Sequence, residues 1–144
     1  MSNVNSFQLE QNESYAVIHW LADHLAAANA EELENAIRLL FKKDYANIIL
    51  NLNKTADLDG YGVSAIRKGT KICTNEGGLF VVITKNEPIA ERLDAAKIES
   101  LTLLNTVQEG VDAIYLNDLE NEFQDEDDTE GESEFGESYG EDFD

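Results

Sequence analysis

The sequence predicts an α/β fold: a single mixed β-sheet with helices packed mainly on one face, followed by an acidic tail. Short runs rich in β-branched residues alternate with segments whose apolar residues recur at helical spacing, in the order β-β-α-β-α-β-α-β-α. A chain of 144 residues is long enough for one domain with a substantial core and too short for two. We therefore expect one domain over residues 1–122 and a disordered acidic tail over residues 123–144.

The first two strands are expected to form an antiparallel hairpin. Phe7 and Leu9 alternate with polar neighbours, and residues 15–20 (YAVIHW) follow a polar turn cluster at 11–14. A helix follows, with Asn29 as its expected N-cap. Its first turn is acidic and its C-terminal end carries lysines, and both signs of charge suit the helix dipole.

The centre of the chain predicts a β-α-β crossover. Residues 46–52 and 79–83 are β-branched runs of the kind that fill a covered sheet. Between them apolar residues repeat at helical spacing over 63–73, and the Glu-Gly-Gly at 76–78 ends the helix. Parallel strands joined by such a helix cross over with right-handed connectivity.

The last third of the domain predicts a helix, a short strand and a final helix. Pro88 lies in the first turn of a helix that extends to Ala96. Residues 101–104 are a candidate strand, and Thr106 with Glu109 resembles a capping box ahead of the last helix.

The net charge of −20 is concentrated at the C-terminal end. Residues 117–144 hold 14 Asp and Glu and no Lys or Arg, which leaves 16 acids against 10 bases in the rest of the chain. Because the body has no basic stripe, nucleic acid and anionic lipid are poor candidates as partners. The tail is either a solubilising segment or an acidic ribbon that docks on a basic, apolar groove through aromatic residues recurring every four positions: Phe135, Tyr139 and Phe143.

The N-terminal residues and the cysteine content favour a cytoplasmic protein. The first residues have neither the cationic nor the apolar region of a secretion signal, and no run approaches the ~20 apolar residues that span a bilayer, so direct membrane insertion is not expected. A single cysteine, Cys73, excludes an internal disulfide and fits a reducing compartment.

The candidate binding site is the loop that leads from the β-branched run at residues 46–52 into the central helix. A strand that passes through a polar loop into a helix N-terminus exposes unpaired amides, which suit an anion or a phosphorylatable side chain. Asp59 is the expected cap for the amides of Tyr61 and Gly62. Gly60 and Gly62 are expected to serve a tight turn, and Tyr61 is either an exposed contact residue or a half-buried plug.

The sequence argues against an enzyme. No nucleophile has a plausible base and orienting group, and the two histidines, His19 and His24, lack a second ligand at metal-binding spacing. We expect no catalytic residue, no metal and no cofactor.

Four stretches of the chain resemble the STAS domain of bacterial anti-sigma factor antagonists, and together they place the resemblance over residues 7–119. LADHLAAANAEEL at 21–33 resembles the family's entry into its first helix, and NIILNLN at 47–53 resembles its central strand. DGYGVSAI at 59–66 resembles the signature Asp-Ser-Ser-Gly-Leu-x-x-Ile, and NEGGLFVVI at 75–83 resembles the following helix exit and strand.

The resemblance implies a phosphorylation switch that this chain has lost. In the family, the first serine after the signature Asp is phosphorylated by a partner kinase that is also the anti-sigma factor, and about two negative charges then break the complex. Here Asp59 and Gly62 match the signature, and Val63 matches its Leu. Gly60 and Tyr61 occupy the two serine positions, so the acceptor position, Gly60, has no hydroxyl.

A second functional position also departs from the family. Ala26 stands where the family usually has an aspartate beside the phosphorylation loop. The resemblance thus implies a protein-binding regulatory module in partner switching and transcription regulation. Its partner surface would comprise Asp59, Gly60, Tyr61, Gly62, Val63 and Ser64, and it would not be switched at the usual serine.

The partner implied by the resemblance is a protein, with an anti-sigma factor kinase as the first candidate. The alternative is an accessory STAS subunit of a multi-protein assembly such as a lipid-transport ABC system. The sequence leaves the oligomeric state open.

Overall fold

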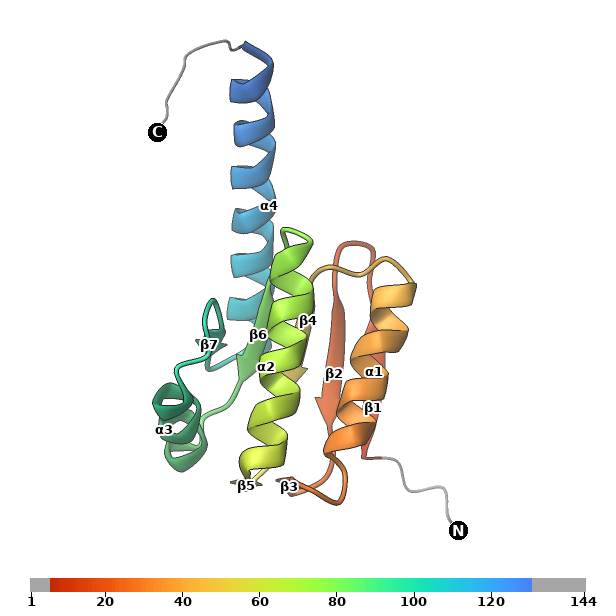
Figure 1. Cartoon of the computed structure of the whole chain (residues 1–144), viewed down its shortest axis with the longest axis vertical. Helices are drawn as coiled ribbons and strands as arrows, with labels where there is room; N and C mark the ends of the chain where they lie inside the picture. The colour runs from red at the N-terminus through yellow and green to blue at the C-terminus, as the bar shows by residue number, and fades with distance from the viewer. Residues whose placement is uncertain (1–5, 131–144) are drawn as a thin grey trace. The chain divides into compact units, whose positions relative to one another are not determined.

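A five-stranded mixed sheet forms the centre of the fold in the computed structural model, which describes residues 6–130 and their side chains through residue 122 (Figure 1). The strands lie in the order β1-β2-β4-β6-β7. β1 pairs antiparallel with β2, and the other neighbours are parallel. The strands are β1 (Phe7–Gln11), β2 (Ala16–Trp20), β4 (Ile48–Asn51), β6 (Phe80–Ile83) and β7 (Thr102–Leu104). The predicted mixed sheet is therefore confirmed.

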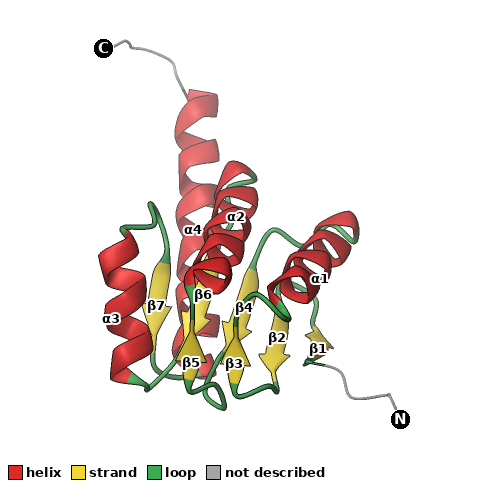
Figure 2. Cartoon of the chain, turned by 60° about the horizontal axis from the view of Figure 1, so that its bottom comes forward, coloured by secondary structure: helices red, strands yellow, loops and turns green. Residues whose placement is uncertain are grey.

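Three helices cover one face of this sheet (Figure 2). They are α1 (Ala30–Lys42), α2 (Gly60–Asn75) and α3 (Glu87–Ala96). On this face Ile18, Leu50 and Val82 belong to the larger core cluster, together with apolar residues of all three helices. Their strand neighbours Val17 and Ile49 point to the other face and belong to a smaller cluster, because side chains alternate along a strand.

The smaller cluster is completed by the beginning of the last helix. This helix, α4 (Val107–Glu130), contributes the buried Val111 and Ile114. The capping box predicted at its start is confirmed, because the Thr106 hydroxyl accepts from the Glu109 amide at 3.1 Å and the Glu109 carboxylate accepts from the Thr106 amide at 3.2 Å.

The chain divides into two compact units, Met1–Ile114 and Tyr115–Asp144. In the second unit α4 continues to Glu130, so residues 123–130 are helical where the sequence predicts the disordered tail to begin. Extending an existing helix avoids the cost of nucleation. The rest of the predicted tail, 131–144, lies outside the described residues. Within residues 6–130, every helix lacks either the length or the apolarity required to cross a bilayer.

The structure adds two short strands that the sequence does not predict. β3 (His24–Leu25) and β5 (Asp57–Leu58) pair in parallel, with His24 opposite Asp57 and Leu25 opposite Leu58. Two residues are too few for a hydrophobic period, so this pairing leaves no sequence signal. It joins the segment before α1 to the segment before α2.

The side chain of Asn29 has a different role from the predicted one. Asn29 occupies the N-cap position of α1, but its side chain makes no capping hydrogen bond. Its Oδ1 accepts from the Ala26 amide at 2.9 Å, and its Nδ2 donates to the His24 carbonyl at 3.1 Å. Asn29 is buried, and it therefore fixes the loop before α1 rather than the helix amides.

Asn47 is a buried polar residue that connects the hairpin to β6. Its Oδ1 accepts from the Leu79 amide at 3.0 Å, and its Nδ2 donates to the Ser14 carbonyl at 3.2 Å. We expect Asn47→Ala to lower the free energy of unfolding by about 2–4 kcal/mol, because two backbone groups lose their partner. Urea denaturation measures the change. The matched control, Asn53→Ala on the exposed turn after β4, should stay within about 0.5 kcal/mol of wild type, and equal losses in both variants would contradict the role of Asn47.

Candidate functional site

The N-terminus of α2 is held against the loop before α1 by one carboxylate. Asp59 is the N-cap of α2, and its Oδ1 accepts from the Gly62 amide at 3.0 Å. Its Oδ2 accepts from the Ala27 amide at 3.1 Å, which lies 32 residues earlier in the chain. The Asp59 amide donates to the Leu25 carbonyl at 3.2 Å, next to the β3–β5 pairing. The predicted cap is thus present, and it also joins two loops.

These contacts determine the charge state of Asp59. Desolvation raises the pKa of its carboxyl group, but hydrogen bonds from the amides of Gly62, Ala27 and Tyr61 and the positive charge of Arg92 together lower the pKa below its ordinary value. Asp59 is therefore ionised at neutral pH. Its negative charge lies at the positive end of the α2 dipole, which it stabilises.

The two glycines of the loop have different physical roles. A Cβ on Gly62 would lie 2.5 Å from the Leu25 carbonyl oxygen and 2.6 Å from Leu58 Cδ1, so a side chain is excluded there. A Cβ on Gly60 would meet nothing within 4 Å. Close packing therefore requires the glycine at 62, whereas the site has room for a side chain at 60.

The exposed part of the predicted partner surface is small. Tyr61 is 66% exposed, which excludes the half-buried plug, and Gly60 beside it is also exposed. Asp59 and Ser64 are half-buried. Gly62 and Val63 lie beneath this surface, and Val63 belongs to the larger core cluster. The loop thus presents one large aromatic side chain on a helix end that Asp59 fixes.

The structure places Ala26 next to this loop. Ala26 stands between Leu25, whose carbonyl accepts from the Asp59 amide, and Ala27, whose amide donates to the Asp59 carboxylate. The sequence does not reveal the part played by Ala27 or by Arg92, because one acts through a backbone amide and the other is a surface charge on a different helix. The only sequence signal for these contacts is Asp59 itself, because a carboxylate that caps a helix with one oxygen has a second oxygen that can accept another hydrogen bond.

The other titratable residues that the sequence singles out serve structural contacts. His19 Nε2 lies 3.0 Å from a Glu10 carboxylate oxygen, and His24 Nδ1 lies 3.0 Å from a carboxylate oxygen of Asp23. In the part of the chain that the structure describes, no three His, Cys, Asp or Glu side chains are grouped to hold a metal ion. Burial raises the pKa of the Cys73 thiol to about 12, so it is protonated and unreactive at neutral pH.

The contacts of Asp59 predict a pH-dependent contribution to stability. Because its pKa is lowered on folding, the stabilisation is present above the ordinary value of 3.8 and is lost as the pH falls through the folded-state pKa. We expect Asp59→Ala to cost about 1 kcal/mol at pH 7 and progressively less below about pH 4, as measured by urea denaturation. The control Asp57→Ala, at an exposed carboxylate two residues earlier, should have little effect. A deficit for Asp59→Ala that does not change with pH would contradict the electrostatic part of this explanation.

Comparison with known proteins agrees with this arrangement of elements. The family model of the STAS domain matches residues 6–110. Comparison with curated protein sequences gives no significant match.

Several solved structures have the same fold at low sequence identity. The protein TM1081 of Thermotoga maritima is 17% identical, with a TM-score of 0.67 over 80% of this chain and 93% of that chain. An anti-sigma factor antagonist from Mycobacterium paratuberculosis is 16% identical, with a TM-score of 0.65 over 76% and 92%. The anti-sigma factor antagonist SpoIIAA in its unphosphorylated form is 19% identical, with a TM-score of 0.61 over 76% and 97%. With a family model matched over most of its length, this chain belongs to the STAS domain family.

Proposed function

We propose that this chain is a protein-binding regulatory module of the anti-sigma factor antagonist type, which docks on its partner through the N-terminus of α2. The observation that carries the proposal is Tyr61, a large aromatic side chain that is 66% exposed on the first turn of α2. Aromatic residues in such positions are typical anchors of protein interfaces, because they bury a large area and lose little conformational freedom. The solved structures of anti-sigma factor antagonists with the same fold support this type of partner.

The site has the stiffness that an anchor requires. Asp59 ties the α2 N-terminus to the Ala27 amide, and the β3–β5 pairing holds the same two loops together. The space around Gly62 is filled by Leu25 and Leu58, which leaves the loop little freedom to rearrange. A pre-formed surface loses less free energy to ordering when it binds.

We further propose that this surface is not switched by phosphate at the usual loop position. SpoIIAA has been solved in a phosphorylated as well as an unphosphorylated form, whereas this chain has Gly60 at the position that the family signature gives to the acceptor serine. The neighbouring hydroxyls are poor substitutes. Thr55 is 3% exposed and donates to the Ala22 carbonyl at 3.1 Å, and Ser64 is half-buried in α2.

Affinity capture with matched variants tests the binding surface. We expect Tyr61→Ala to reduce capture of an anti-sigma kinase from the native cytosol at least tenfold, with little change in melting temperature, because an interface aromatic contributes to binding and not to the core. Phe41→Ala is the control, since Phe41 is also an exposed aromatic but lies in the last turn of α1. Equal capture by wild type and Tyr61→Ala would refute the proposed surface. A membrane ATPase in place of the kinase would favour the accessory-subunit alternative.

Restoring the hydroxyl tests the missing switch. We expect Gly60→Ser to fold normally, because a Cβ at 60 would meet no atom within 4 Å, and to gain one phosphate from a cognate anti-sigma kinase. The helix N-terminus would help accommodate that phosphate. Adding Ala26→Asp, with Tyr61 kept as the anchor, should increase the extent of modification. Intact-mass spectrometry measures the gain. Wild-type protein that takes up phosphate and releases its partner would refute the claim that the switch is absent.

A further inference from the structure

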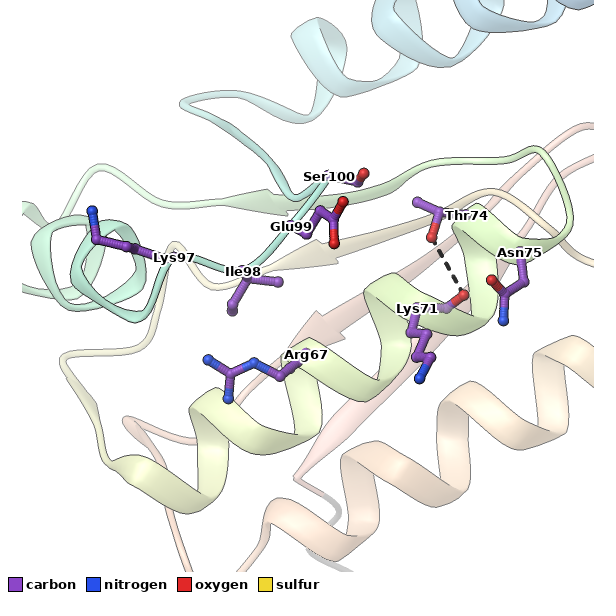
Figure 3. A pocket seen from close by; sticks show the side chains of 8 residues that line it. All are labelled: Arg67, Lys71, Thr74, Asn75, Lys97, Ile98, Glu99 and Ser100. Carbon is purple, nitrogen blue, oxygen red and sulfur yellow. Dashed lines mark hydrogen bonds between the residues drawn. The ribbon is translucent and has the colours of Figure 1, made fainter.

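The exposed side of α2 is bordered by two cavities. A groove of about 290 Å³ lies between α1 and α2, with an apolar floor made by Ile37, Ala65 and Ile72. A second cavity, of about 500 Å³, lies between α2 and the segment after α3 (Figure 3). Lys71 and Asn75 line both, so the two cavities adjoin one another across α2. All of their lining residues belong to the first compact unit.

This surface has an excess of positive charge, although the net charge of the whole chain is −20. Five of the ten Lys and Arg residues of the chain line the two cavities, and we call them the basic face: Arg38, Arg67, Lys68, Lys71 and Lys97. The acidic lining residues are Glu34 and Glu99, which leaves an excess of three positive charges. The sequence shows no basic stripe because these residues are spread from α1 to the loop after α3. The fold brings them together.

The contacts within the structure leave most of this positive charge uncompensated. Glu34 lies 3.3 Å from the Lys68 ammonium group and 3.9 Å from the Arg38 guanidinium group, so two bases share one carboxylate. Arg67 donates to a backbone carbonyl at 2.9 Å, and a neutral carbonyl does not cancel its charge. Lys71 extends from α2 toward α1 (Figure 3), and none of the ion pairs within the described residues involves it. The basic face therefore attracts a ligand of opposite charge.

The basic face lies on the same stripe of α2 as Tyr61. Residues that recur at intervals of three and four share one face of a helix. Such a series starts at Tyr61 and continues through Ser64, Lys68, Lys71 and Asn75, all of which are exposed or half-buried. The ten positions from Tyr61 to Lys71 span about 15 Å along the helix. The anchor of the proposed partner surface and the basic face therefore form one continuous surface.

A partner that docks on Tyr61 reaches the basic face. A standard protein interface buries about 800 Å² on each partner, which corresponds to a patch roughly 30 Å across. A patch of that size centred on Tyr61 extends about 15 Å, which is the distance to Lys71. Like charges placed opposite one another at an interface weaken binding. The partner therefore has to present neutral or acidic groups at this position.

We propose that the partner surface continues along α2 to the basic face, which binds an acidic segment of the partner protein whose apolar side chains enter the α1–α2 groove. The excess of positive charge determines the sign of the segment, and the apolar floor determines its other side chains. This inference rests on the proposed function, since it names the chemistry of the same partner. Nucleic acid fits less well, because its binding depends on neutralising many phosphates, whereas Glu34 and Glu99 interrupt the bases here.

An NMR titration of the full chain with defined peptides tests the proposal. The probe is a peptide in which glutamates surround two leucines, and its control has glutamine in place of every glutamate. At low salt, where exposed charges are screened least, we expect the acidic peptide to shift the amide signals of Arg38, Lys68 and Lys71 and to bind at least tenfold more tightly than the control. Equal affinities, or shifts centred on Lys54 and Lys85, would overturn the proposal. So would tighter binding of a single-stranded oligothymidylate at the same amides.

Charge reversal supplies the matched variants. Lys68→Glu with Lys71→Glu should lower the affinity for the acidic peptide at least tenfold. Lys54→Glu with Lys85→Glu makes the same change in net charge at exposed positions outside the two cavities and should change the affinity less than twofold. Lys68→Gln with Lys71→Gln removes the two charges without placing an acid beside Glu34, and it should give a smaller loss in the same direction even if the reversed pair is destabilised. Equal losses in the two reversed pairs would refute the basic face as the binding site.

Capture of the anti-sigma kinase separates this inference from the proposed function. We expect Lys68→Glu with Lys71→Glu to reduce capture at least fivefold at low salt and less at high salt. Capture that is lowered by Tyr61→Ala but not by this pair would refute the acidic partner segment and leave the proposed function intact. Peptide binding that depends on Lys68 and Lys71, together with capture that Tyr61→Ala leaves unchanged, would refute the docking surface at Tyr61 and leave the site for an acidic segment intact.

Discussion

The geometry of the candidate site depends on the carboxylate of Asp59. A helix N-terminus leaves amides without partners, and one of them, Gly62, donates to Asp59. The second oxygen accepts from Ala27, so the same group that caps α2 also fixes the loop entering α1. Two segments far apart in sequence are thereby held as one rigid edge, and the exposed aromatic ring of Tyr61 is presented from it.

The packing around this edge explains why the loop keeps one glycine and is free to vary at the other. Leu25 and Leu58 close over Gly62, and they are the residues that the β3–β5 pairing places opposite one another. The scaffold therefore remains complete although position 60 lacks a hydroxyl. The shape of the loop depends on the buried contacts of Gly62, whereas position 60 is exposed and takes no part in them.

The two ends of α2 present different chemistry. Its N-terminus carries an ionised carboxylate, two glycines and an aromatic side chain, whereas its C-terminal half adjoins an apolar groove with a basic rim. The groove floor consists of Ile37, Ala65 and Ile72, and Arg38, Lys68 and Lys71 line its rim.

The sequence by itself determined the strands of the main sheet, the order of the helices and the caps of α2 and α4. Hydrophobic period and cap chemistry are local properties, and Asp59 and the Thr106–Glu109 pair show them directly. Only the tertiary structure decided the β3–β5 pairing, the inward turn of the Asn29 side chain and the contact between Asp59 and Ala27. In two of these three cases the backbone groups that meet are more than 30 residues apart. Every residue except proline has the same backbone amide and carbonyl, so the sequence does not show which of these groups will pair.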